Sequence, residues 1–118
     1  MSTWTEYVFL MGLVCLVLHE LDAIQQKEWR FFFRSFLADQ TSYRLFVFLH
    51  FPLLLWILWA LDSTQFQIGM SLFLVIHAGL HWVLRNHPLI QFENSFSRVW
   101  IYGGATFGLI HLILLLSR

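Results

Sequence analysis

The residues best suited to chemistry in this 118-residue chain are histidines that lie in apolar surroundings: His19, His50, His77 and His81, with Asp22 close to the first of them. Neutral imidazole is a good ligand for zinc, copper, iron and nickel, and a carboxylate adds negative charge to such a site. Ionisable side chains within a hydrocarbon layer are costly, and they usually face a helix bundle, where they pair or bind something. These residue types predict a site for a divalent transition metal, with zinc or iron favoured.

The spacing of these residues supports one shared site. His77 and His81 are four residues apart and share a helix face, and His19 and Asp22, three apart, do the same. At about 1.5 Å of rise per residue, the four histidines occupy one layer, about 6 to 12 Å inward from the nearest basic residues. Helical bundles build metal sites from such inward pairs on facing helices. We therefore expect the four histidines as ligands, and Asp22 as a fifth ligand or as an acceptor that orients a histidine.

Other carboxylates and one further histidine are secondary candidates. Glu20 points about 100° away from the neighbouring histidine and is the candidate general base for a metal-bound water. Glu28 reaches the site only if the first helix ends before it. Glu93 and His87, in a later loop, are possible additional ligands. A zinc-protease HExxH motif is excluded, because Ala23 stands where its second histidine is required.

The composition identifies the setting as a lipid bilayer. Hydrophobic residues make up 58% of the chain and charged residues 12%, against roughly 45–50% and 25% in soluble domains. A chain this short cannot hide so much apolar surface in one core. The formal net charge of zero argues against a nucleic-acid binder, and the single Cys15 excludes a disulfide framework or a thiolate metal cluster.

Four apolar runs approach the roughly 20 residues that a membrane-spanning helix needs. We predict an all-α, four-helix integral membrane bundle, one domain over residues 1–118, with spans at about 7–24, 45–61, 66–84 and 99–116. The amphipathic segment 25–37 predicts an interfacial helix after the first span.

Basic residues predict the orientation of the bundle. They cluster in the connections after the first and third spans: Lys27, Arg30, Arg34 and Arg44, then Arg85 and Arg98. The opposite side carries only Arg118. By the positive-inside rule, these connections face the cytoplasm and both termini are extracytoplasmic.

Three functions remain open at this stage. The first is a metal-binding membrane protein, acting as a metalloenzyme on a lipid-soluble substrate at the cytoplasmic leaflet. The second is a non-catalytic accessory or assembly subunit of a larger membrane complex, or a homo-oligomer, in which the polar residues hydrogen-bond helices together. The third is a bis-histidine haem protein with axial ligands from the four histidines.

The order of the motifs resembles that of the HXXEE-motif family of small bacterial integral membrane proteins. The counterparts are the segments 19–23 (HELDA), 77–81 (HAGLH) and 102–105 (YGGA). Asp22 replaces the first glutamate of that motif and Ala23 the second, which weakens a two-metal, carboxylate-bridged interpretation. The resemblance implies a multi-pass protein of a bacterial inner membrane with a polar cluster, and it supplies no substrate.

Overall fold

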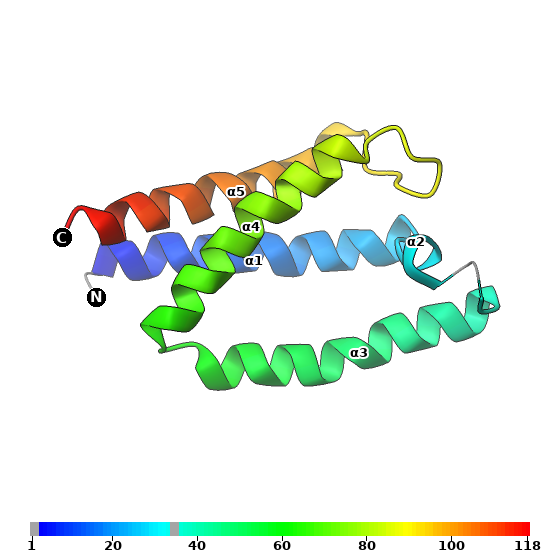
Figure 1. Ribbon diagram of the computed structural model, residues 1–118, viewed down its shortest axis with the longest axis horizontal. Helices are drawn as coiled ribbons and strands as arrows, with labels where there is room; N and C mark the ends of the chain where they lie inside the picture. The colour runs from blue at the N-terminus through cyan, green and yellow to red at the C-terminus, as the bar shows by residue number, and fades with distance from the viewer. Residues whose placement is uncertain (1–2, 34–35) are drawn as a thin grey trace.

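The computed structural model describes residues 3–33 and 36–118, and its regular structure in those ranges is entirely helical (Figure 1). Four helices are long and apolar enough to cross a membrane, which confirms the predicted fold class. The helices are α1 (Thr3–Gln25), α2 (Trp29–Phe33), α3 (Asp39–Ala60), α4 (Thr64–Val83) and α5 (Ser95–Leu116).

Several helices begin before the apolar runs that predicted them, because polar side chains close their first turns. The Asn94 side chain accepts a hydrogen bond from the Ser97 N–H at the start of α5, and Ser63 accepts one from Phe66 at the start of α4. Such caps satisfy backbone groups that have no partner within the helix. The amphipathic helix is short, since α2 holds only five residues, and Arg34 lies outside the described residues.

The two basic connections lie at the same end of the molecule. Figure 1 places α2 and the α4–α5 connection at one end, with both termini and the α3–α4 turn at the other. This arrangement agrees with an even number of spans. Which end faces the cytoplasm remains a prediction from the sequence.

Helices α1, α4 and α5 form the compact part of the fold. A Cβ atom on Gly108 would lie 2.8 Å from the Ser71 carbonyl oxygen, so the absence of a side chain allows α5 to approach α4 this closely. Beside this contact, the Ser71 hydroxyl hydrogen-bonds Nδ1 of the fully buried His111 at 2.8 Å. His111 therefore serves the packing of α4 against α5.

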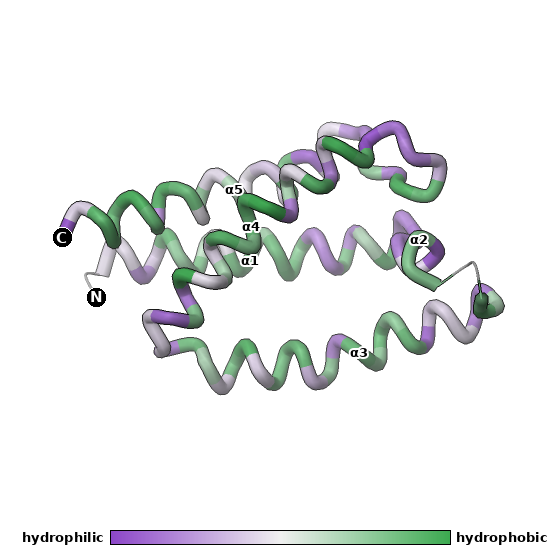
Figure 2. Tube along the Cα trace, viewed as in Figure 1, coloured by the Kyte–Doolittle hydropathy of each residue, from purple (hydrophilic) through white to green (hydrophobic). Residues whose placement is uncertain are grey.

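Helix α3 stands apart from the other three long helices. Only Ser42, Phe46 and Ile57 are buried among its residues, and most of its large apolar side chains are exposed. Figure 2 shows that α3 is hydrophobic along much of its length. Between α3 and the pair α1 and α4 lies a cavity of about 510 Å³. Outward apolar side chains of this kind suit contact with lipid.

Candidate metal centre

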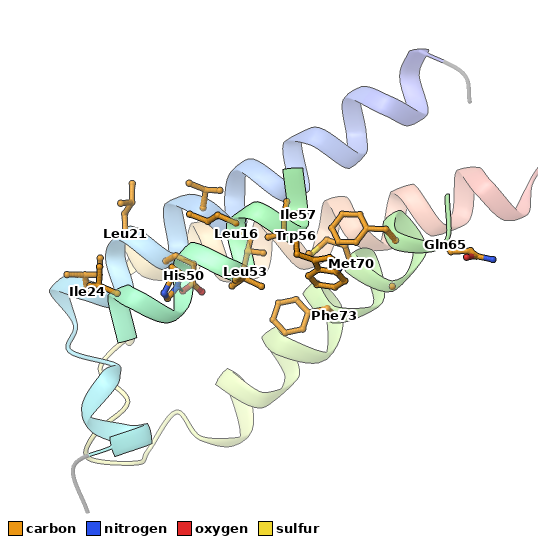
Figure 3. Close-up of a pocket in the computed structure, with 16 residues that line it drawn as sticks. Leu16, Leu21, Ile24, His50, Leu53, Trp56, Ile57, Gln65, Met70 and Phe73 are labelled. Atoms are coloured by element: carbon orange, nitrogen blue, oxygen red, sulfur yellow. Dashed lines mark hydrogen bonds and ion pairs between the residues drawn. The ribbon is translucent and has the colours of Figure 1, made fainter. Parts of the chain in front are cut away.

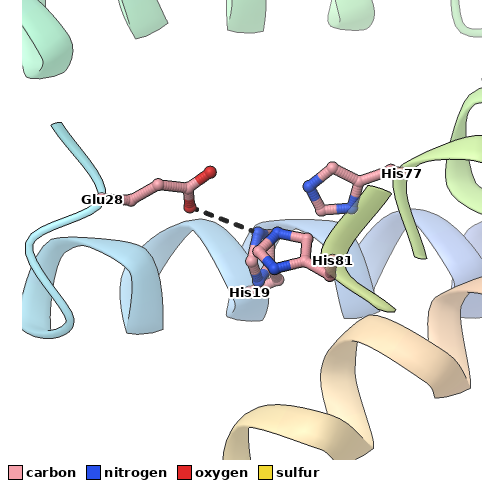
Figure 4. Close-up of side chains that lie close together, drawn as sticks. All are labelled: His19, Glu28, His77 and His81. Atoms are coloured by element: carbon pink, nitrogen blue, oxygen red, sulfur yellow. Dashed lines mark ion pairs between the residues drawn. The ribbon is translucent and has the colours of Figure 1, made fainter. Parts of the chain in front are cut away.

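Four side chains from three segments converge in the interior of the protein. His19 comes from α1, His77 and His81 come from α4, and Glu28 comes from the connection between α1 and α2. One ligand atom of each lies within 4.8 Å of those of the other three (Figure 4). We call these four residues the His₃Glu cluster.

The three histidines meet because one turn of α4 faces one position of α1. The rings of His77 and His81, one helical turn apart, have centroids 4.6 Å from each other. The His19 ring lies 4.6 Å from that of His77 and 5.0 Å from that of His81. The helix periodicity therefore fixes the α4 pair, and the packing of α1 adds the third imidazole.

Glu28 reaches the cluster because α1 ends before it. The helix stops at Gln25, and Lys27 adopts a left-handed backbone conformation with φ of 57°. The Glu28 N–H then bonds the Ala23 carbonyl at 3.0 Å, which folds the chain back along α1. As a result, Glu28 Oε2 lies 3.7 Å from His19 Nε2. Glu28 was expected to reach the site only if the first helix ended before it, and α1 does end at Gln25.

The cluster is buried, and several of its polar atoms lack hydrogen-bond partners. His19 is 1% exposed, and His81 and Glu28 are each 7% exposed. Among the described residues, both ring nitrogens of His19, Nδ1 of His81 and Oε2 of Glu28 have no such partner. A buried polar atom without a partner costs about 1–3 kcal/mol. Each residue can offer one ligand atom to a bound cation, which would satisfy one nitrogen of His19 together with the free atoms of His81 and Glu28.

The charge state of Glu28 reflects this environment. Burial, with a smaller contribution from the nearby Glu20 carboxylate, raises the pKa of Glu28 to about 8. In the absence of a cation the Glu28 carboxyl therefore retains its proton at neutral pH. A cation would favour the ionised form, because an opposite charge lowers the pKa of a carboxyl group.

His50 and Glu20 form a pair beside the cluster rather than within it. His50 Nε2 lies 2.5 Å from Glu20 Oε2, and its Nδ1 lies 2.7 Å from the Phe46 carbonyl oxygen. The other carboxylate oxygen of Glu20 lies 3.9 Å from His19 Nε2. The structure thus brings together three of the four histidines singled out from the sequence and places Glu20 between them and the fourth.

Asp22 faces α5 instead of the three histidines. Its Oδ2 accepts a hydrogen bond of 2.5 Å from the Ser97 hydroxyl, and Oδ1 accepts one of 3.4 Å from Gln26. Ser97 was not singled out from the sequence. The cap residue Asn94 marks a helix start there, but no sequence signal indicates the partner on α1.

The two loop candidates also lie apart from the cluster. His87 accepts a hydrogen bond from the Leu89 N–H at 3.1 Å, and its ring packs against Phe31. Glu93 forms an exposed ion pair with Arg98. From the same loop, the hydrophobic side chain of Phe92 does reach the cluster: its ring lies 5.2 Å from that of His19 and 4.8 Å from that of His81.

The donor set of the cluster fits a transition metal. Three imidazoles and one carboxylate are the nitrogen and oxygen ligands that zinc takes in proteins. Three of the four residues, His19, His81 and Glu28, hold a buried atom without a hydrogen-bond partner that coordination could use. The Phe92 ring packs against His19 and His81 and thereby shields this side of the His₃Glu cluster from bulk water.

Comparison with known proteins gives one match. The model of a family described as "Family of unknown function (DUF6713)" matches residues 5–118. No curated protein and no solved structure matches the chain significantly.

Proposed function

The chain belongs to the DUF6713 family of unknown function, and we propose that it is an integral membrane protein that binds one divalent transition metal ion. One observation carries the proposal: three imidazoles and a carboxylate converge within 4.8 Å, and four of their buried atoms have no hydrogen-bond partner. His19, His77, His81 and Glu28 are the proposed ligands.

The proposed activity is that of a metalloenzyme with a lipid-soluble substrate at the cytoplasmic leaflet. A zinc-like ion held by these residues would supply Lewis acidity, and with a coordination position left for water beside its protein ligands it would lower the pKa of that water toward 7. We propose Glu20 as the group that accepts a proton beside the cluster, because it lies 3.9 Å from His19 and its side chain is 27% exposed. Asp22, His50, His87 and Glu93 have other partners, and we assign them no direct ligand role.

The order of motifs leads us to propose a distant relation to the HXXEE-motif proteins as well. Within that hypothesis, the chain is a multi-pass protein of a bacterial inner membrane with its basic connections in the cytoplasm. The ordering of His19, His77 and Tyr102 along the chain supports the relation.

Elemental analysis of the detergent-purified protein tests metal binding. We expect about one zinc or iron ion per chain, as in a mononuclear site with four protein ligands. His77→Gln combined with His81→Gln should abolish it, because an amide replaces each imidazole donor. His87→Gln, a histidine in the loop outside the cluster, is the matched control and should retain the metal.

Two outcomes would refute the proposal. One is protein without stoichiometric zinc, iron, copper or manganese after purification and reconstitution. The other is a metal content that the double variant leaves unchanged. An absorption spectrum taken on the same sample distinguishes a bound haem, since a Soret band assigns the histidines to haem iron instead.

The accessory-subunit alternative has its own supporting observation. Two hydrogen bonds join separate helices, Asp22 to Ser97 and Ser71 to His111, as in polar networks that hold membrane helices together. If the His₃Glu cluster has the same role, His81→Gln should preserve folding and co-purification with a larger complex. A metal site would instead lose its ion with this change.

A further inference from the structure

The cavity between α1, α3 and α4 (Figure 3) has none of the four His₃Glu residues in its lining. It lies next to the cluster, because its lining residues Glu20 and Phe73 contact His19 and His77. Its volume of about 510 Å³ is within the range of roughly 300–1,000 Å³ typical of ligand pockets. Side chains such as Leu16, Leu53 and Met70 make its walls largely apolar. Among the described residues that line it, the polar side chains are Glu20, His50 and Gln65.

The polar pair in the wall of this cavity is neutral as a unit. Both ring nitrogens of His50 face oxygen atoms, the Phe46 carbonyl at 2.7 Å and the Glu20 carboxylate at 2.5 Å. Two arrangements of protons satisfy these contacts: an imidazolium beside a carboxylate, or a neutral imidazole that accepts from a protonated Glu20. Each has a net charge of zero, so the pair complements an uncharged hydrogen-bonding group.

The depth of the Glu20–His50 pair below the membrane interface also favours a ligand with an uncharged polar group. His50 lies six residues beyond Arg44 along α3, about 9 Å at the rise of an α-helix. A phospholipid keeps its charged headgroup at the interface, because a charge within the hydrocarbon region is costly. A molecule whose polar end reaches Glu20 and His50 must therefore have an uncharged head.

The cavity and the His₃Glu cluster share a wall. Glu20 Oε1 lies 3.9 Å from His19 Nε2. Phe73, which lines the cavity, stacks on His77 with ring centroids 5.3 Å apart and an angle of 26° between the planes. A head bound at Glu20 is thus held beside the proposed metal ligands.

We propose that this cavity binds a single-chain lipid with an uncharged hydroxyl or carbonyl head. The head hydrogen-bonds the Glu20–His50 pair, and the chain lies along Leu53, Met70 and Ile57 toward Gln65. The claim that this lipid is the substrate of the metal centre rests on the proposed function. The claim that the cavity binds the lipid rests only on the cavity and on the Glu20–His50 pair.

Photolabelling of the full-length protein in detergent with hexadecanol that carries a mid-chain diazirine tests the proposal. Labels should map to the cavity walls, unlabelled hexadecanol should compete, and hexadecane and dioleoylphosphatidylcholine should compete poorly. In the double variant Glu20→Leu/His50→Leu, hexadecanol should lose its advantage over hexadecane, because both members of the pair that hydrogen-bonds the head are gone.

Two glycines of α4 provide a matched pair of variants. Gly69 lines the cavity and Gly79 does not, and a Cβ on either glycine meets no atom within 4 Å. Gly69→Phe should fill the cavity and lower labelling by roughly tenfold, the change produced by about 1.4 kcal/mol of lost binding. Gly79→Phe should label like the wild type, and both variants should retain the wild-type metal content.

Several results would overturn the proposal: labelling that does not saturate, equal competition by hexadecane or the phospholipid, or undiminished labelling of Gly69→Phe. Metal content separates this failure from that of the proposed function. A metal-loaded protein without saturable labelling refutes the lipid site alone. A metal-free protein with saturable cavity labelling refutes the metal centre and leaves the lipid site standing.

Discussion

Replacement of Glu28 by glutamine should separate metal binding from the stability of the fold. Glutamine keeps the shape of the side chain but cannot ionise. If Glu28 is a metal ligand, Glu28→Gln should lower zinc affinity by roughly 10- to 100-fold or more, since even changes behind the direct ligands have effects of that size. The same substitution should stabilise the metal-free protein at alkaline pH.

The stabilisation follows from the pKa of Glu28. In the folded protein this pKa is raised from 4.5 to about 8, so ionisation is harder there than in the unfolded chain by on the order of 5 kcal/mol. Below pH 4.5 both states are protonated and no penalty exists. As the pH rises toward 8, the folded state loses up to about 1.4 kcal/mol of stability per pH unit, and the loss levels off above that pH. The glutamine variant lacks this loss.

Thermal unfolding of chelator-treated protein, followed by circular dichroism from about pH 5 to about pH 9, measures the effect. The variant and the wild type should unfold at similar temperatures at the acidic end and diverge as the pH rises, with the variant more stable. Glu93→Gln, at an exposed carboxylate paired with Arg98, should show no comparable divergence. A Glu28→Gln variant that is no more stable than the wild type at about pH 8 would refute the reasoning.

Three further results are expected. Gly108→Ala should lower the free energy of unfolding by about 1–3 kcal/mol, because its Cβ would lie 2.8 Å from the Ser71 carbonyl oxygen. Denaturant titration in detergent measures this loss, and an unchanged unfolding midpoint would contradict the close packing of α4 and α5. Ser97→Ala should lower the free energy of unfolding by about 1–3 kcal/mol, because it removes the 2.5 Å hydrogen bond to Asp22. The metal content of this variant should equal that of the wild type, and a loss of metal would show that Asp22 contributes to the metal site. A reporter enzyme that works only outside the cytoplasm should be active when it is fused after Arg118, because both termini are predicted to be extracytoplasmic. A signal from a cytoplasmic reporter at the same position would reverse the predicted orientation.

The membrane-spanning architecture was predictable from local features of the sequence. Long apolar runs must be helical in a bilayer, because the backbone groups of a helix satisfy one another. The pairing of His77 with His81 was equally local, since residues four apart share a helix face. The possibility that Glu28 folds back was also visible in the change of composition after residue 25.

The tertiary structure decided which polar residues share a site. Residues three apart on a helix differ in direction by about 60°, so α1, packed against both α4 and α5, presents His19 to one neighbour and Asp22 to the other. Sequence spacing gives the depth and relative phase of each residue, but it does not give the rotation of one helix against the next.

The same limit applies to His50. Its depth along α3 was consistent with the layer of the other histidines, yet α3 stands off from α4, and a cavity of about 510 Å³ lies where direct contact was expected. Glu20 fills the intervening position and bonds His50 instead. The sequence by itself determined four spans and the residues able to bind a metal. Helix packing alone decided that three of the histidines converge with Glu28 while the fourth lines a lipid-sized cavity, because the distance between helices depends on side chains far apart in the chain.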